Sequence, residues 1–334
     1  MENTPMPEET HLPQFEQKID LQELRTAVDA IRDNIAQVIV GQEDVIDYLI
    51  AAILANGHVL LEGVPGVAKT LTAKLVAKSL DIQFNRIQFT PDLMPSDILG
   101  TSTFNMKTSE FQFRKGPIFS QLVLIDEINR APAKTQAALF EVMEERQISI
   151  DGEQFTMDAP FLVLATQNPI EQEGTYRLPE AQLDRFLFKI NIDHPELDHE
   201  IEILTRENNQ DGTDKTAAIR SVIKGIDIKT LQQTVRKILV ENDLLKYIAQ
   251  VVCQTREHPF IFLGASPRAS IAILNAAKAF AAIAGRDFVI PDDVKAAAVP
   301  VLIHRIVVSP EREMEGVTAK EIITQIIENT EIPR

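Results

Sequence analysis

Eight consecutive residues organise this chain, Gly63-Val64-Pro65-Gly66-Val67-Ala68-Lys69-Thr70, and they lie between a short apolar run at 58–61 and a helical pattern that opens at Leu71. Glycines let the backbone turn tightly and point several N–H groups at one anion, while the helix N-terminus adds a positive dipole. Lys69 can reach the outer phosphates of a nucleotide, and the Thr70 hydroxyl can ligate Mg²⁺. A Gly-Pro turn with an exposed lysine is the alternative, but the strand, the loop, Lys-Thr and the helix occur together here. The sequence therefore predicts a phosphate-binding loop with the eight residues and Leu71 as its nucleotide contacts.

One position departs from the strict form of this loop. The strict pattern has glycine before the lysine, and this chain has Ala68. If Ala68 lies at the helix entrance with a negative φ, alanine costs little there and favours the helix. The departure leaves room for an altered nucleotide affinity.

A second motif is an apolar run that ends in two carboxylates, Leu122-Val123-Leu124-Ile125-Asp126-Glu127. Open α/β sheets bind ligands at the carboxyl ends of their parallel strands. Asp126 can hold Mg²⁺, directly or through water, and Glu127 can polarise the water that attacks a γ-phosphate. Acidic residues are common at exposed strand ends, so this motif indicates a nucleotide site only in combination with the phosphate loop. Together the two motifs predict binding and hydrolysis of Mg-ATP.

Short apolar runs alternate with helical patterns through the first two thirds of the chain. That alternation is typical of an α/β fold in which helices cover both faces of a mostly parallel sheet. The runs that we interpret as strands are 58–61, 83–89, 122–125, 161–165 and 186–190.

The strand pattern fades after Asp193, and helical patterns follow. We therefore predict a nucleotide-binding α/β core at 21–194 and a smaller all-α domain at 195–334. The polar segment 208–216 is either a linker between domains or a loop inside the second one. The acidic, proline-containing tail at 1–20 is predicted to be disordered.

Two segments interrupt the α/β rhythm, and both are predicted to be hairpins. The first, 101–115, alternates around the polar turn Lys107-Thr108-Ser109. The second, 147–157, has the pair Asp151-Gly152 between alternating apolar residues, which is a strong hairpin signal.

Composition narrows the functional classes. With 33 basic and 49 acidic residues the net charge is −16, which repels phosphate backbones and disfavours non-specific nucleic-acid binding. No apolar run reaches the roughly 18 residues of a membrane helix, and the first twenty residues lack the pattern of a secretory signal. The single cysteine, Cys253, lies in an apolar series and is predicted to be a buried thiol. These features favour a cytoplasmic protein without a transmembrane segment.

Four motifs together resemble the MoxR family of AAA+ ATPases, over about residues 20–330. They are Gly-Val-Pro-Gly-Val-Ala-Lys-Thr at 63–70, Leu-Ile-Asp-Glu-Ile-Asn-Arg-Ala at 124–131, Ala-Thr-Gln-Asn-Pro at 165–169 and Leu-Pro-Glu-Ala-Gln-Leu-Asp-Arg-Phe at 178–186. The resemblance implies a P-loop NTPase core with a helical lid, using ATP and Mg²⁺. It also implies a homo-oligomeric ring, expected to be hexameric, with sites between subunits. The implied role is chaperone-like maturation of a protein client, often with a partner that bears a von Willebrand factor A domain.

The resemblance also implies roles for residues outside the two motifs. Asn168 matches the sensor 1 residue, which contacts the attacking water or the γ-phosphate, although it could simply start the Asn-Pro turn. Arg268 matches the sensor 2 arginine of the lid, acting on its own subunit's nucleotide or on a neighbour's. The segment Val40-Gly41-Gln42 resembles the loop beside adenine, although Gly-Gln is also an ordinary helix entrance.

Arg185 matches the arginine finger, which is supplied to the neighbouring subunit. The alternative role for Arg185 is an ion pair with Asp184 or Glu180. Two other arginines could then be the finger, namely Arg177 and Arg130.

Two rival functions compete with a chaperone-like ATPase: a nucleic-acid motor and a nucleotide switch without turnover. Net charge and the few basic residues on the hairpins oppose the motor, and Glu127, Asn168 and Arg185 would have no task in the switch. The apolar hairpin residues suit contact with a protein client, or else they pack inward and leave only the turns exposed. These residues are Phe104, Met106, Phe111, Phe113, Ile148, Ile150 and Phe155.

Overall fold

The structure is a computed structural model, and it describes most of the chain from Ile19 to Ile332. The described ranges are 19–64, 66–150, 152–168, 175–176, 178–208, 219, 221–222 and 228–332. The disorder prediction for the tail therefore falls outside them, apart from its last two residues. Three residues that the sequence singled out also lie outside, namely Pro65, Asp151 and Arg177.

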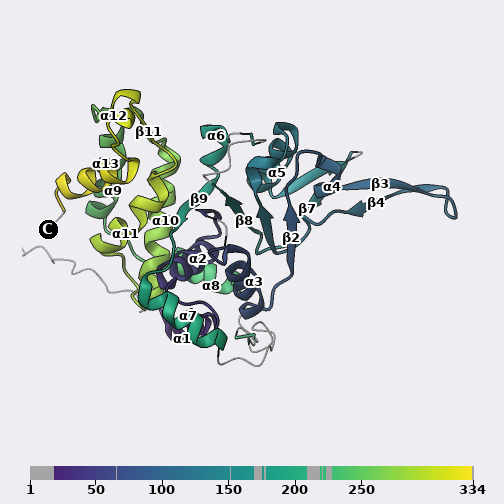
Figure 1. Ribbon diagram of the computed structural model, residues 1–334, viewed down its shortest axis with the longest axis horizontal. Helices are drawn as coiled ribbons and strands as arrows, with labels where there is room; N and C mark the ends of the chain where they lie inside the picture. The colour runs from purple at the N-terminus through teal and green to yellow at the C-terminus, as the bar shows by residue number, and fades with distance from the viewer. Residues whose placement is uncertain are drawn as a thin grey trace, which may run out of the picture.

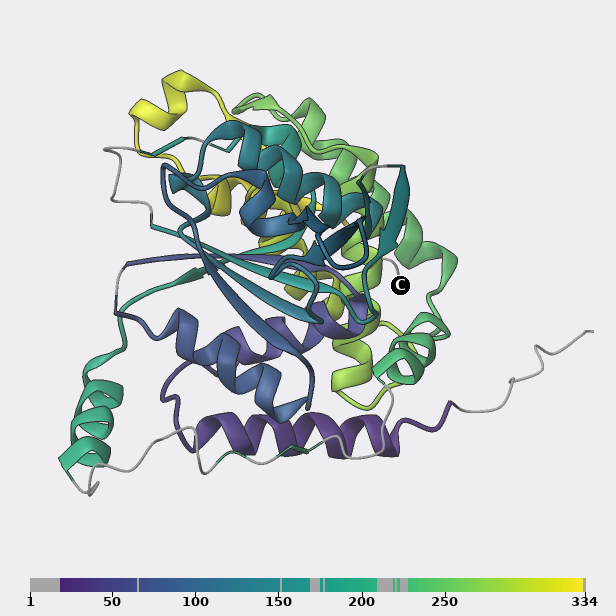
Figure 2. The same ribbon diagram turned by 90° about the vertical axis from the view of Figure 1, so that its right-hand side faces the viewer.

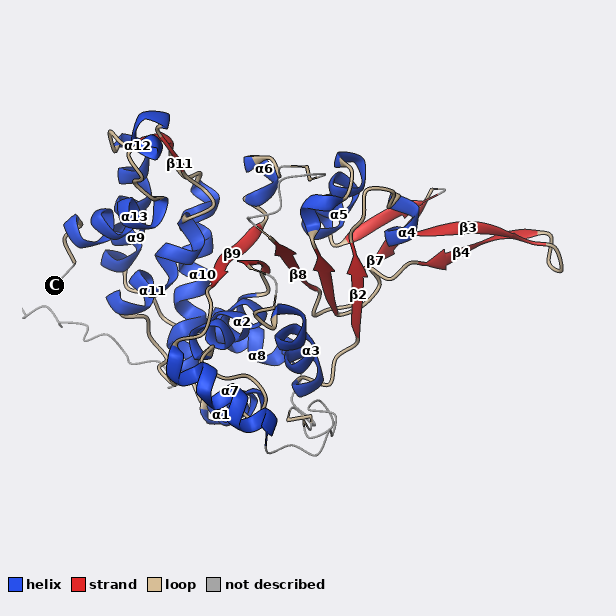
Figure 3. Cartoon of the chain, viewed as in Figure 1, coloured by secondary structure: helices blue, strands red, loops and turns tan. Residues whose placement is uncertain are grey.

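Five parallel strands form the central sheet in the order β2-β5-β8-β1-β9. Figures 1 and 3 show this sheet, with β2, β8 and β9 labelled. Each of the five strands coincides with a run that the sequence predicted as a strand, which confirms the α/β interpretation. The interior strand β5 is buried at every position, as expected for a parallel strand covered on both faces. The strands are β1 (His58–Gly63), β2 (Phe84–Gln88), β5 (Leu122–Asp126), β8 (Leu162–Gln167) and β9 (Phe186–Ile192).

Helices cover both faces of the sheet, as Figure 2 shows. Alternate residues of β5 face opposite layers: Leu122 and Leu124 join the apolar cluster formed with α1, α2 and α3, whereas Val123 and Ile125 join the cluster formed with α5. This period of two is the geometry of an extended chain. The helices are α1 (Gln22–Ala36), α2 (Glu43–Ala55), α3 (Lys69–Ser79), α4 (Pro95–Leu99), the short η1 (Ile128–Arg130), α5 (Ala133–Glu145) and the short α6 (Glu180–Leu183).

The region after β9 is mainly helical and shares an apolar cluster with α1 and α2. Gln232 Nε2 donates to the Ile53 carbonyl at 2.7 Å, which adds a polar contact between α8 and α2. A small antiparallel ribbon of β10 (Ile261–Leu263) and β11 (Val307–Val308) departs from the all-α prediction, because strands of three and two residues leave no periodic signal. The helices are α7 (Leu197–Asn208), α8 (Ile228–Arg236), α9 (Asn242–Glu257), α10 (Pro267–Ile283), α11 (Pro291–Leu302), α12 (Pro310–Met314) and α13 (Ala319–Asn329).

The first hairpin projects from the body of the molecule, at the right of Figure 1. It consists of β3 (Gly100–Asn105) and β4 (Glu110–Lys115), paired antiparallel as predicted. Three of its apolar side chains are exposed to solvent, and we call them the apolar tip: Phe104 (52%), Met106 (88%) and Phe111 (74%).

The second hairpin, β6 (Gln147–Ile150) with β7 (Glu153–Thr156), also forms as predicted. Its apolar side chains pack inward. Ile148 is buried, and the ring of Phe155 lies 4.5 Å from that of Phe113, centroid to centroid. For this hairpin, therefore, the inward-packing alternative is the correct one.

The prediction of a buried thiol at Cys253 was wrong, because its side chain is exposed. Helix α9 buries Ile248, Val251, Val252 and Thr255, and Cys253 lies about 100° around the helix from Val252. Among the described helices, none is long and apolar enough to cross a bilayer.

Candidate functional site

A cavity of about 370 Å³ opens at the carboxyl ends of the strands and brings both sequence motifs together. Helix α3 begins at Lys69, so the phosphate loop presents a helix N-terminus to this cavity. The residues that line it are Gly66, Val67, Ala68, Lys69, Thr70, Leu71, Arg86, Gln88, Asp126, Glu127, Thr166, Gln167 and Asn168.

Lys69 lies over its own loop. Its Nζ donates to the carbonyls of Gly63 and Val64, the latter at 3.2 Å. Burial lowers the pKa of Lys69, while the carboxylates of Asp126 and Glu127 oppose that shift. The ammonium group is thus held beside the loop amides, where a phosphate can bind both.

The loop needs glycine at Gly63. A Cβ there would lie 2.5 Å from the Ile192 carbonyl oxygen of the neighbouring strand β9. Gly63 therefore lets β1 and β9 approach closely at the edge where the loop starts.

The condition under which alanine would cost little at this position, a negative φ, is not met. Ala68 is the N-cap of α3 and has φ +59, in the left-handed region that favours glycine. Alanine in this region costs about 1–2 kcal/mol, because its Cβ approaches the following carbonyl oxygen. The backbone at Ala68, where the strict pattern has glycine, is therefore locally strained.

Replacing this alanine by glycine should stabilise the fold. We expect Ala68→Gly to raise the free energy of unfolding by about 1 kcal/mol, measured by denaturant titration. Ala137→Gly, in the exposed interior of α5, is the matched control and should lower it by about 1 kcal/mol. Equal destabilisation by both variants would contradict strain at Ala68.

Asp126 is the centre of a buried polar cluster. The Thr70 hydroxyl lies 3.3 Å from its Oδ1, and Thr166 Oγ1 donates to the same oxygen at 3.2 Å. Arg86 Nε lies 2.5 Å from Oδ2. The Asp126 carboxylate and the Thr70 hydroxyl are oxygen donors of the kind that Mg²⁺ prefers.

Two protein donors are few for a metal site, but they suit Mg²⁺. The described residues contain no group of three or more His, Cys, Asp or Glu side chains that could hold a metal. Mg²⁺ is usually held by one or two protein oxygens together with water and substrate phosphates. Thr70 and Asp126 fit this pattern.

Glu127 lies beside Asp126 and is held from two sides. Gln88 Nε2 donates to its Oε2 at 2.8 Å, and Arg130 Nε lies 2.9 Å from the same oxygen. Glu127 has φ +57, and its backbone N–H donates to Thr166 Oγ1 at 3.0 Å. These contacts fix the carboxylate at the mouth of the cavity, and they place Arg130 beside Glu127 of the same chain.

Sequence reasoning missed Arg86 and Gln88. Both lie on β2, which pairs with β5 so that Gln88 is opposite Asp126. The available signal was a pair of polar residues two apart in a predicted strand. It carries no information on which strand lies next to β5.

The other residues predicted for nucleotide binding lie around the cavity. Asn168 follows the end of β8, is buried and lines the cavity. Val40 and Gly41 precede α2 and are not among the described lining residues. Gln42 reaches the loop, since its Nε2 donates to the Val67 carbonyl at 3.1 Å. The adenine role of 40–42 stays a prediction.

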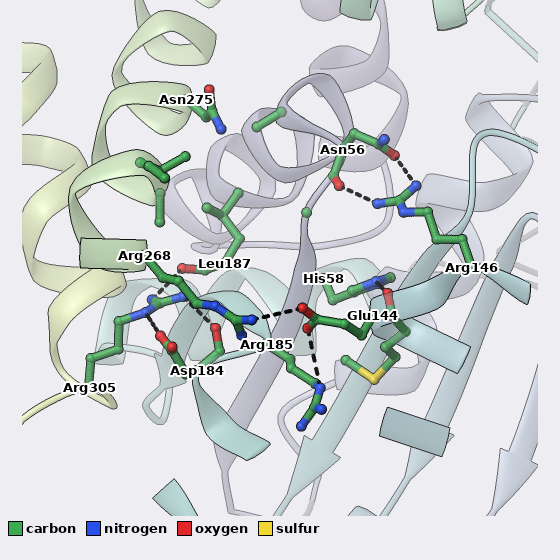
Figure 4. Close-up of a pocket in the computed structure, with 15 residues that line it drawn as sticks. Asn56, His58, Glu144, Arg146, Asp184, Arg185, Leu187, Arg268, Asn275 and Arg305 are labelled. Carbon is green, nitrogen blue, oxygen red and sulfur yellow. Dashed lines mark hydrogen bonds and ion pairs between the residues drawn. The ribbon is translucent and has the colours of Figure 1, made fainter. Parts of the chain in front are cut away.

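Arg185 and Arg268 lie together in a second pocket of about 290 Å³, shown in Figure 4. This pocket shares none of its lining residues with the first cavity. Both arginines contact Glu144 at the end of α5: Arg268 Nη2 lies 3.0 Å from Oε1, and Arg185 Nε lies 3.3 Å from Oε2. Arg185 therefore pairs with Glu144 and not with Asp184.

Asp184 instead connects the core to the helical region. Arg305 Nε lies 2.6 Å from its Oδ1, and Arg305 Nη2 donates to the Phe186 carbonyl at 2.6 Å. Burial lowers the pKa of the Arg305 guanidinium, and Asp184 opposes that shift. Ser266 Oγ, at the N-cap of α10, lies 3.3 Å from the second Asp184 oxygen.

Comparison with known proteins agrees with this geometry. The family model for the ATPase family associated with various cellular activities (AAA) matches residues 58–188, and the AAA lid domain matches 253–326. A crystal structure of a protein from Cytophaga hutchinsonii superposes with a TM-score of 0.86 at 41% identity, covering 94% of this chain and 97% of that one.

Three curated relatives match most of the chain. The Bacillus subtilis protein YeaC is 46% identical over 90% of this chain and 93% of its own. Chaperone MoxR1 of Mycobacterium tuberculosis is 43% identical over 90% and 81%, and protein MoxR of Paracoccus denitrificans is 32% identical over 83% and 87%. With the phosphate loop, the acidic strand end and the lid in place, the chain belongs to the MoxR family of AAA+ ATPases.

Proposed function

We propose that this chain hydrolyses Mg-ATP within a ring of its own copies, and that it uses the cycle to remodel a protein client. One observation carries the proposal. The residues suited to bind and hydrolyse ATP share one cavity, whereas Arg185 and Arg268 lie in a separate pocket with no lining residue in common. In this proposal a single subunit has a nucleotide cavity without the arginines and an arginine pocket without a nucleotide, and two neighbours in a ring complete one site.

The first cavity supplies binding and activation of water. The loop amides and Lys69 bind the phosphates, while Thr70 and Asp126 hold Mg²⁺. Bound Mg²⁺ offsets the charge that develops on the phosphate oxygens. Glu127 accepts a proton from the attacking water, and Asn168 orients that water.

The second pocket supplies cations to a neighbour. Arg185 begins the segment into β9, Arg268 lies in the first turn of α10, and both side chains converge on Glu144. Neither lines its own subunit's cavity among the described residues. We therefore assign both arginines to the γ-phosphate of the adjacent subunit in the ring, where a guanidinium can offset transition-state charge.

The apolar tip suits a protein client better than a nucleic acid. Its three side chains are large, apolar and exposed. The hairpin that carries them projects from the body of the molecule (Figure 1). One of the few basic residues nearby is already engaged, because Lys115 Nζ lies 4.9 Å from the centroid of the Phe119 ring. The net charge of −16 also opposes a phosphate backbone. A partner with a von Willebrand factor A domain and a cytoplasmic location belong to this proposal, as the family resemblance implies.

Removing the apolar tip should uncouple client binding from ATP binding. In a Glu127→Gln background, replacing its three side chains by serine should reduce the co-purifying client at least about tenfold, because apolar anchors carry most of the energy of an interface. The melting temperature and the ATP affinity should stay unchanged. The measurement is quantitative mass spectrometry of proteins captured from the native host.

A variant that changes charge alone is the matched control. It replaces the basic residues of the same hairpin by alanine: Lys107, Arg114 and Lys115. This variant should keep its client. Salt-sensitive DNA binding by the parent, lost in this variant, would instead support a nucleic-acid motor.

A further inference from the structure

The carboxylate of Glu144 contacts both arginines of the second pocket. One oxygen lies 3.0 Å from Arg268 Nη2 and the other 3.3 Å from Arg185 Nε, as the dashed lines in Figure 4 mark. We call this three-residue contact the Glu144 bridge. It joins a residue of the core helix α5, a residue before β9 and a residue of α10.

The surroundings explain why a carboxylate is held here. Glu144 lies in the last turn of α5, where the negative end of the helix dipole disfavours an acidic side chain. Two guanidinium groups offset that cost. The same two groups would repel each other if no anion lay between them.

The contacts of the bridge are weak enough to be exchanged. The side chain of Arg268 is 58% exposed, and that of Glu144 is 35% exposed. Arg185 Nε lies at ion-pair distance but has no well-oriented hydrogen bond within the described part of the chain. Ion pairs that stay partly open to water contribute little to stability. A phosphate, with more charge and three oxygens, makes stronger bonds to guanidinium groups.

The two arginines are also connected through the backbone elements that carry them. Asp184, next to Arg185, accepts contacts from Arg305 and from Ser266 at the start of α10. Arg268 lies two residues after Ser266. Asp184 thus links the segment that carries Arg185 to the start of α10, which carries Arg268.

We propose that the Glu144 bridge is a resting contact that competes with assembly. In the free subunit the carboxylate occupies Arg185 and Arg268, and in the ring the neighbour's γ-phosphate replaces it. This inference rests on the proposed function, since it needs a phosphate that arrives with a second copy. Glu144 is thus a positioning residue that sets how readily ATP-loaded subunits associate.

Glu144→Gln tests this directly, because it keeps the shape and removes the charge. We expect half-maximal assembly with a non-hydrolysable ATP analogue at about fivefold lower protein concentration, measured by sedimentation, which corresponds to a loss of competition of about 1 kcal/mol. The specific activity at saturating protein should change less than twofold. Glu145→Gln is the matched control, as the next residue on the exposed side of α5, and should behave like the parent.

Each outcome separates the bridge from the proposed function. A parent that assembles with ATP, with Glu144→Gln at the same midpoint, would overturn the bridge and leave the shared site standing. A parent that neither assembles nor gains activity with concentration would overturn the shared site itself. Glu144→Asp, whose shorter side chain keeps the charge, should restore the midpoint toward that of the parent. A Glu144→Asp midpoint equal to that of Glu144→Gln would show that charge is not the cause.

Discussion

Lys69→Ala should weaken ATP binding by at least about a hundredfold. The Lys69 ammonium is held beside the loop, and each hydrogen bond to a charged group contributes about 1.5–3 kcal/mol. Arg86 is the other cation that lines the described cavity, and it is paired with Asp126, so it is a poor substitute. Isothermal titration calorimetry measures the affinity.

Glu127→Gln should separate binding from turnover. Glutamine keeps the size of the side chain but cannot take the proton of the attacking water. We expect ATP affinity within a few fold of the parent and a turnover number at least about 10²-fold lower, since general-base catalysis contributes about 10²–10⁴.

The contradicting outcome for the first variant is equally clear. If Lys69→Ala bound ATP as tightly as the parent, the site assignment would be wrong.

Arg185→Ala should reduce turnover by about 10³–10⁵, the range for an arginine finger in other phosphoryl-transfer enzymes. Its own cavity stays intact, because Arg185 lines the other pocket. ATP binding should therefore be retained, and sedimentation should still show an assembled ring. The specific activity of the parent should rise with protein concentration.

Arg25→Ala is a control for general charge effects. Arg25 is exposed on α1 and forms a long ion pair with Asp29 at 3.9 Å, so its loss should leave turnover within about twofold. A fully active Arg185→Ala would exclude Arg185 as the finger. A concentration-independent activity of a proven monomer would exclude the shared site altogether.

The core of this site could be predicted from sequence because its parts are continuous motifs. The phosphate loop and Asp126-Glu127 each follow an apolar run, and parallel strands bring their carboxyl ends to one edge. Arg86 and Gln88 could not be found in that way. Their role depends on β2 lying beside β5, and strand order is set by packing over long distances.

Backbone conformation and side-chain partners were two other features that could not be predicted from the sequence. The positive φ of Ala68 follows from the path of the loop into α3. The residue type alone predicts a negative φ, because alanine disfavours the left-handed region. The partner of Arg185 is Glu144, 41 residues earlier in the sequence, and not Asp184 or Glu180. Exposure of the first hairpin and burial of the second likewise depend on which one projects from the body.

Complementation between two inactive variants tests the shared site most directly. Lys69→Ala is expected to bind ATP too weakly to be loaded but keeps Arg185, whereas Arg185→Ala is expected to bind ATP but lacks the finger. Neither variant alone should hydrolyse ATP, and an equimolar mixture should recover a measurable fraction of the parent's rate. Mixing Arg185→Ala with a Lys69→Ala/Arg185→Ala double variant should recover nothing. An assembled mixture of the two single variants that stays inactive would contradict an active site completed by the neighbouring subunit.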